Sequence, residues 1–108
     1  MTVVTAEGLR ALAYAQIEYL ECTHHVVHFH LLSGEDVVSL SLRVSFAEVA
    51  KPLLEDGRFL QPHRSYVVNL EAVQLLSPGE VRMRSGARIP IPRGREAAVR
   101  EAFCTRVG

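Results

Sequence analysis

The chain of 108 residues has no tryptophan, only two cysteines and a single lysine. Cys22 and Cys104 lie far apart and form no CxxC pair, so we interpret both as small apolar residues. No apolar run approaches the roughly 20 residues that a membrane-spanning helix needs, and no secretion signal is recognisable at Met1. These absences argue against a disulfide-stapled secreted domain and predict a cytoplasmic protein.

Groupings of residues that would support catalysis are also absent. Aspartate occurs only at positions 36 and 56, and the neighbours of Ser65 form no G-x-S-x-G turn. We therefore predict no enzymatic activity and no cofactor. Four of the five histidines lie within seven residues, but without the spacing of a tetrahedral metal site, so strand imidazoles are the favoured interpretation and a metal site stays an alternative. These histidines are His24, His25, His28 and His30.

The composition fits one folded domain over residues 1–108. Hydrophobic residues make up 48% of the chain and charged residues 22%, which argues against disorder. Period-two alternation of apolar residues predicts strands. We expect strands over 3–5, 9–12, 17–22, 26–32, 37–40, 66–68, 72–76, 81–84 and 88–91.

Two helices are predicted among the strands. Ser45 is a typical helix N-cap, and the helix that follows should bury one side formed by Phe46, Val49 and Leu53. Pro52 should kink or shorten this helix, because proline removes one backbone hydrogen bond. The segment from residue 96 to 103 contains good helix formers and predicts a C-terminal helix.

The net charge of zero hides an asymmetry along the chain. Residues 1–60 hold four basic and eight acidic residues, whereas residues 61–108 hold eight arginines and four glutamates. No acid occurs between Glu80 and Glu96, a stretch that contains five arginines. Eleven of the twelve basic residues are arginine, the side chain best suited to fork onto phosphate or guanine. This pattern favours nucleic acid as a partner.

The most informative segment is His63-Arg64-Ser65-Tyr66-Val67-Val68-Asn69. A buried strand accounts for its aromatic and β-branched residues but not for the His-Arg pair that precedes them. The segment resembles the central motif of the LytTR DNA-binding domains of bacterial response regulators. Further resemblance extends over 17–21, 38–54 and 89–93, and so covers almost the whole chain.

The resemblance implies a mainly β fold, an elongated sandwich of several small mixed sheets with one short central helix and a C-terminal helix. It also implies that His25 and Arg93 reach base edges in successive major grooves, with Arg64 on the backbone or minor groove between them. His63 belongs to the same interface. Further arginines would neutralise phosphates, namely Arg82, Arg84, Arg88 and Arg95. For Asn69 we expect a structural role at the end of its strand.

The sequence therefore predicts sequence-specific binding of double-stranded DNA by the output domain of a transcriptional regulator. The resemblance further implies promoter repeats as the target, leaves room for a homodimer on DNA, and implies a sensory or receiver domain N-terminal to this one in a full-length protein. The alternative is a non-enzymatic β domain that binds protein or RNA. Aromatic residues are only 6% of the chain, which leaves few surfaces on which single-stranded bases could stack.

Overall fold

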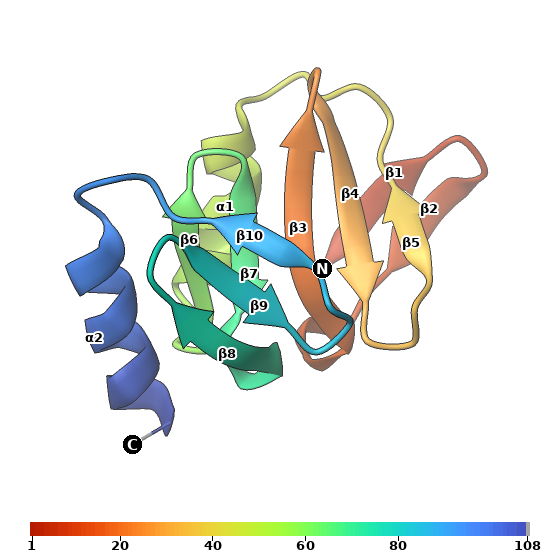
Figure 1. Ribbon diagram of the computed structural model, residues 1–108. Coiled ribbons are helices and arrows are strands. Elements are labelled where there is room, and N and C mark those ends of the chain that lie inside the picture. The colour runs from red at the N-terminus through yellow and green to blue at the C-terminus, as the bar shows by residue number, and fades with distance from the viewer. Residues whose placement is uncertain (108) are drawn as a thin grey trace.

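The computed structural model describes residues 1–107, and ten strands in three sheets form most of its regular secondary structure (Figure 1). The first sheet is a hairpin of β1 (Thr2–Thr5) and β2 (Gly8–Ala11). The central sheet has the order β5-β4-β3-β7-β6 and the third the order β10-β9-β8. The central strands are β3 (Ile17–Thr23), β4 (Val26–Leu31), β5 (Asp36–Val38), β6 (Phe59–His63) and β7 (Tyr66–Asn69). The third sheet contains β8 (Val73–Ser77), β9 (Glu80–Met83) and β10 (Arg88–Pro90).

The predicted mainly β architecture is confirmed, and so are the two helices, α1 (Phe46–Leu54) and α2 (Glu96–Val107). The expectation of mixed sheets is corrected, because every strand pair is antiparallel. Tight turns join most neighbouring strands, and a two-residue turn can only connect antiparallel partners. One strand, β6, lacked a sequence prediction because Pro62 interrupts its pattern. The extents of 38 × 25 × 24 Å agree with an elongated molecule.

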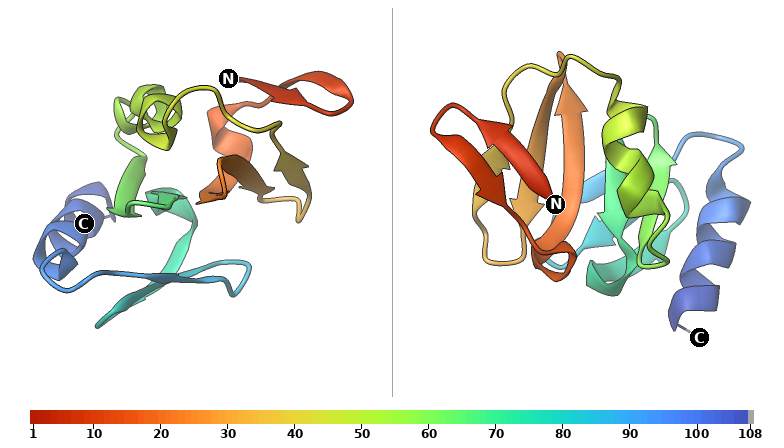
Figure 2. Two further views of the ribbon diagram at one scale, coloured as in Figure 1. Left: turned by 90° about the horizontal axis from the view of Figure 1, so that it is seen from above. Right: turned by 180° about the vertical axis from the view of Figure 1, so that it is seen from behind.

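The central sheet is covered on both faces. Seen from above in Figure 2, α1 and the first hairpin lie on one side of it and the third sheet on the other. Strand β7 shows this most clearly, because Val67 packs into the core beneath α1 while Val68 packs into the core shared with the third sheet. Strand β4 instead buries alternate residues, Val27, Phe29 and Leu31, and leaves its second face partly open. No helix in residues 1–107 is long and apolar enough to cross a bilayer.

Helix α1 follows the predicted cap but only part of its predicted face is buried. The Ser45 hydroxyl accepts a hydrogen bond from the Glu48 amide at 3.2 Å, and the helix continues through Pro52 to Leu54. Leu53 is fully buried, whereas Phe46 and Val49 are only half-buried. Val49 borders an open cavity, which explains why its side chain is less enclosed than that of Leu53.

We predict that Leu53→Ala lowers the free energy of unfolding by about 2–5 kcal/mol, because a fully buried leucine leaves a cavity when it is truncated. Phe46→Ala should cost less, because part of its ring already contacts water. Urea denaturation of both variants measures the difference. A larger loss for Phe46→Ala than for Leu53→Ala would show that the helix packs on another face.

Candidate nucleic-acid interface

Two turns from different halves of the chain lie side by side at one edge of the central sheet, the upper edge in Figure 1. Residues 24–25 connect β3 to β4, and residues 64–65 connect β6 to β7. Because β3 and β7 are antiparallel, with Glu21 opposite Tyr66, the end of one strand adjoins the start of the other. The Cys22 amide donates to the Ser65 carbonyl at 2.8 Å, which ties the two turns together.

The His-Arg-Ser turn is held by its own neighbours. The Ser65 amide donates to His63 Nδ1 at 3.0 Å, and Gln61 Nε2 donates to the Arg64 carbonyl at 3.2 Å. The His63 ring also packs edge-on against Tyr66, with 5.5 Å between ring centres. The Arg64 side chain is exposed and makes no side-chain hydrogen bond or ion pair within residues 1–107. His63 therefore shapes the turn, while Arg64 points a free guanidinium into solvent.

The segment between β10 and α2 is fastened to the same turn. Arg95 Nη2 donates to the Gln61 carbonyl at 2.6 Å, and the Arg95 amide donates to the Pro92 carbonyl at 3.0 Å. Gly94 adopts a φ of 94°, a conformation that favours glycine, and so turns the chain toward α2. Arg93 is exposed and has no side-chain partner among the described residues. Gln61 thus links the backbone of Arg64 to the loop that presents Arg93.

The histidine turn and the loop between β5 and α1 form the remaining part of this edge. His24 and His25 have φ values of 51° and 63°, the left-handed pair that a two-residue hairpin turn requires. The His25 carbonyl accepts from the Leu42 amide at 2.7 Å, which brings Arg43 to the same edge. Sequence reasoning missed Arg43, because only the register of the folded chain places its loop beside His25.

We define the basic edge as the segments 24–25, 39–45, 63–65 and 91–95. It contains no aspartate or glutamate and holds four exposed arginines and three histidines. The carboxylate of nearby Glu21 already has partners: it accepts a hydrogen bond from the Tyr66 hydroxyl at 2.9 Å and lies 3.4 Å from His30 Nε2. Burial, and then this hydrogen bond to Glu21, raise the pKa of Tyr66. The edge is therefore positive although the chain as a whole is neutral.

The other predicted phosphate contacts do not share this edge. Arg82 and Arg88 lie opposite each other on β9 and β10. The next pair along these strands, Val81 and Ile89, is buried on the other face of the sheet. Arg88 Nε is 3.8 Å from Glu80, and Arg82 Nε is buried without a hydrogen-bond partner in the described chain. These two side chains belong to the outer face of the third sheet.

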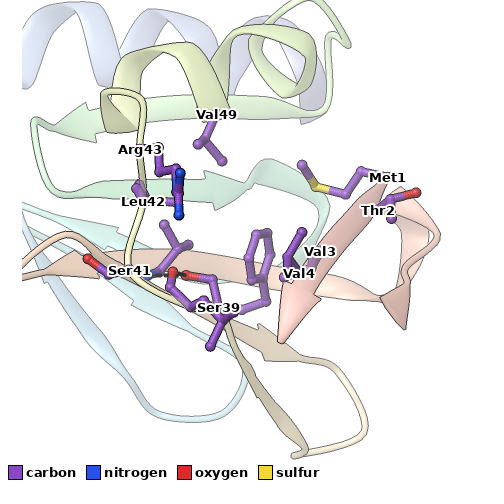
Figure 3. Close-up of a pocket in the computed structure, with 12 residues that line it drawn as sticks. Met1, Thr2, Val3, Val4, Ser39, Ser41, Leu42, Arg43 and Val49 are labelled. Carbon is purple, nitrogen blue, oxygen red and sulfur yellow. Dashed lines mark hydrogen bonds between the residues drawn. The ribbon is translucent and has the colours of Figure 1, made fainter. Parts of the chain in front are cut away.

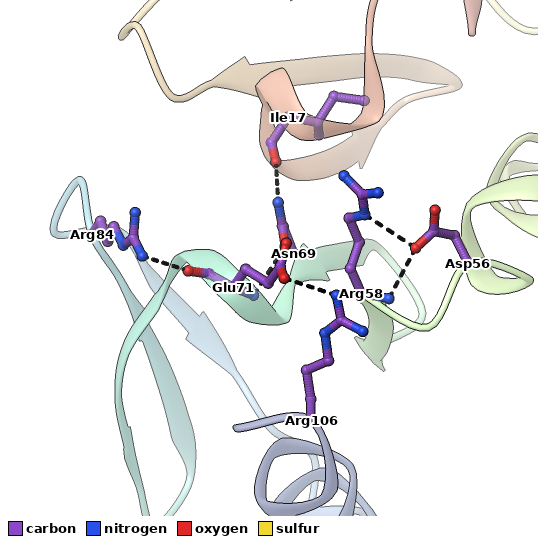
Figure 4. Close-up of polar contacts among 7 residues, drawn as sticks. All are labelled: Ile17, Asp56, Arg58, Asn69, Glu71, Arg84 and Arg106. Carbon is purple, nitrogen blue, oxygen red and sulfur yellow. Dashed lines mark hydrogen bonds and ion pairs between the residues drawn. The ribbon is translucent and has the colours of Figure 1, made fainter. Parts of the chain in front are cut away.

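Arg84 lies at the opposite end of the molecule from the basic edge. Its Nη2 donates to the Glu71 carbonyl at 2.7 Å (Figure 4). The neighbouring Ser85 amide donates to the buried carboxylate of Glu18, at the start of β3. Acids gather at this far end, since the turn before β5 carries Glu35 in addition.

Asn69 closes the motif with a structural contact, as predicted. Its Nδ2 donates to the Ile17 carbonyl and its Oδ1 accepts from the Glu71 amide, both at 2.9 Å (Figure 4). The side chain is 2% exposed, so it has no access to a ligand. It joins the end of β7 to the start of β3 and thereby fixes the pair of strands that carry the two turns.

The histidine cluster is divided by the fold. His24 and His25 occupy the turn, while His28 and His30 share the open face of β4. His30 stacks on Tyr19 at 4.2 Å and its Nδ1 lies 2.6 Å from Asp36. Burial raises the pKa of Tyr19 to about 12, with a further contribution from nearby Glu21. Within residues 1–107, no three potential ligands lie in positions that suit a metal ion.

A sandwich of small sheets that presents arginine-bearing loops along one edge is suited to a polyanion such as nucleic acid. The family model described as the LytTr DNA-binding domain matches residues 7–103. No curated protein matches the sequence. A solved structure of the LytTr DNA-binding domain of a response regulator from Bacillus cereus has a TM-score of 0.76 at 20% identity, covering 95% of this chain and 94% of that one. The chain belongs to the LytTR family of DNA-binding domains.

We predict that Asn69→Ala lowers the free energy of unfolding by roughly 1–3 kcal/mol, because it leaves the Ile17 carbonyl and the Glu71 amide without their partner. Gln74, an exposed amide on β8, provides the matched control. Gln74→Ala should change the stability by less than about 0.5 kcal/mol. Equal melting temperatures of Asn69→Ala and Gln74→Ala in thermal denaturation would contradict a structural role for Asn69.

Proposed function

We propose that this chain binds double-stranded DNA sequence-specifically and serves as the output domain of a cytoplasmic transcriptional regulator. The observation that carries the proposal is the acid-free basic edge, in which four loops are joined by hydrogen bonds between their backbones and side chains. Loops tied to a rigid sheet are suitable for groove recognition, because their backbone is already ordered and loses little entropy on binding. Membership of a DNA-binding family supports the same partner.

The residues of the edge are proposed to divide into readout and positioning. His25 and Arg93 would contact base edges in two successive major grooves, and Arg64 would contact the backbone or minor groove between them. A molecule 38 Å long is able to reach into two grooves, which are about 34 Å apart along the duplex. Arg95 and His63 hold the loops in place, because the side chain of each is hydrogen-bonded to the backbone, Arg95 to the Gln61 carbonyl and His63 to the Ser65 amide.

The remaining arginines are proposed to differ in role. Arg43 extends the edge and would contact phosphate. Arg82 and Arg88, on the outer face of the third sheet, would add affinity without sequence information. Arg84 is left out of the proposed interface, because it is engaged with Glu71 at the far end of the molecule. A homodimer on repeated sites and an N-terminal sensory or receiver domain complete the proposal for the full-length regulator.

We predict that binding to duplex DNA weakens steeply with salt. Each arginine that contacts a phosphate releases condensed counterions, with a log-log slope of about −0.9 per contact. Selection from random duplexes by gel shift at two salt concentrations measures the site and this slope together. An affinity that does not change between low and physiological salt would contradict a phosphate-dominated interface and would favour a protein-binding domain.

We predict that three arginines respond differently to alanine substitution. Arg93→Ala should cost about 1–3 kcal/mol on the selected site and relax selectivity at one base position. Arg82→Ala should weaken all duplexes alike and reduce the salt slope by about one. Arg84→Ala should have almost no effect, because a charge more than a Debye length of about 8–10 Å from the phosphates is screened.

The measurement compares the three variants on the selected site, on a single-base variant and on random duplex. Thermal denaturation of each variant is the control for folding. Equal losses on all three duplexes for Arg93→Ala would make Arg93 a backbone contact. A selective loss for Arg84→Ala would place the interface at the other end of the molecule.

A further inference from the structure

A cavity of about 470 Å³ lies between β1, the first turns of α1 and the loop that leads into α1 (Figure 3). Val27 and Phe29 of β4 line it and are themselves almost fully buried. Val3, Leu42 and Val49 add further apolar surface from three other elements. The volume falls within the range of about 300–1,000 Å³ that small-molecule sites occupy. Apart from Arg43, none of the side chains that line it is among the proposed DNA contacts.

One charged side chain lines this cavity, and it has no counter-ion. The Arg43 guanidinium lies at one end of the cavity in Figure 3, across from Met1. No acid is among the lining residues, and Arg43 makes no ion pair within residues 1–107. The remaining polar groups are hydroxyls, including Ser39, which is already engaged with Val27 and Leu40. An apolar chamber with one free guanidinium complements a ligand that has an apolar body and one anionic group.

The same loop connects the cavity to the basic edge. Ser39, Leu42 and Arg43 all line the cavity, and the Leu42 amide donates to the His25 carbonyl at 2.7 Å. A ligand anion on Arg43 would neutralise one of the four exposed arginines of the edge. It would also constrain the loop that supports the histidine turn. Occupation of the cavity would therefore oppose binding of DNA through Arg43.

We propose that this cavity binds a small monocarboxylate with an unbranched apolar chain, and that this binding weakens binding of DNA. The carboxylate would accept hydrogen bonds from the Arg43 guanidinium, and the chain would lie against Val27, Phe29 and Val49. The evidence for the ligand site is the cavity and its lining, and it does not depend on the proposed function. The antagonism with DNA rests on the proposed function.

The site is tested with octanoate and decanoate as probes, each below its micellar concentration, by calorimetry and by amide chemical shifts of the 108-residue chain. Each CH₂ buried should raise the affinity about fourfold, so decanoate should bind about sixteenfold more tightly than octanoate. Arg43→Gln should weaken decanoate binding by about tenfold or more. Val49→Phe, which fills part of the cavity, should weaken it as well.

Arg100→Gln is the matched control, because Arg100 is an exposed arginine on α2, away from the cavity. This variant should bind decanoate like the parent chain. Equal affinities of the parent chain and Arg43→Gln would overturn the site, as would an absence of saturable binding or shifts confined to residues outside the cavity. Thermal denaturation of Arg43→Gln is the control for folding.

The antagonism is tested by repeating the gel shift with decanoate present. The apparent Kd for DNA should rise with decanoate, and by reciprocity DNA should weaken decanoate binding by the same factor. The effect should disappear in Arg43→Gln. If decanoate and DNA both bind without affecting each other's affinity, the antagonism is refuted, whereas the proposed decanoate site remains supported. Binding of decanoate by a chain that binds no DNA would refute the proposed function and still support the site.

Discussion

Strand β3 pairs antiparallel with β4 on one side and with β7 on the other, and this double pairing fixes the place of the two turns that bear His25 and Arg64. The strands are adjacent in space although β3 and β7 are more than 40 residues apart in sequence. Asn69 secures one end of the pair through Ile17, and the Cys22 amide secures the other through Ser65. The basic edge is a consequence of this register, because a shift of one residue would turn every side chain of β7 to its other face.

Several arginines of this molecule form ion pairs with nearby acids, whereas the arginines of the basic edge form none within residues 1–107. The basic edge holds no acid, whereas the opposite end holds Glu18, Glu35 and Glu71, each already hydrogen-bonded. Arg10 donates to both oxygens of Glu35, and this lowers the pKa of that carboxyl. A neutral chain can thus present a positive surface to a polyanion, since the potential near a surface depends on the local arrangement of charges.

The sequence was sufficient for the fold class, the motif and the structural role of Asn69, because each of these depends on local patterns or on a strong resemblance. It was insufficient for the spatial grouping of the arginines. Arg82 and Arg84 are two residues apart and look alike in sequence, yet one lies on the outer face of a sheet and the other is held by Glu71. Arg43 and Gln61 gave no local signal, because their importance arises only from contacts across the fold, that of the neighbouring Leu42 amide with His25 and that of the Gln61 carbonyl with Arg95.

Amide chemical-shift mapping with the selected duplex tests the central claim most directly, namely that the basic edge is one binding surface. We expect the largest shifts to fall together in residues 24–25, 42–43, 63–65 and 92–95, with small shifts in the turns at 33–36 and 84–86. Large shifts at those two far turns, with the basic edge unchanged, would contradict it.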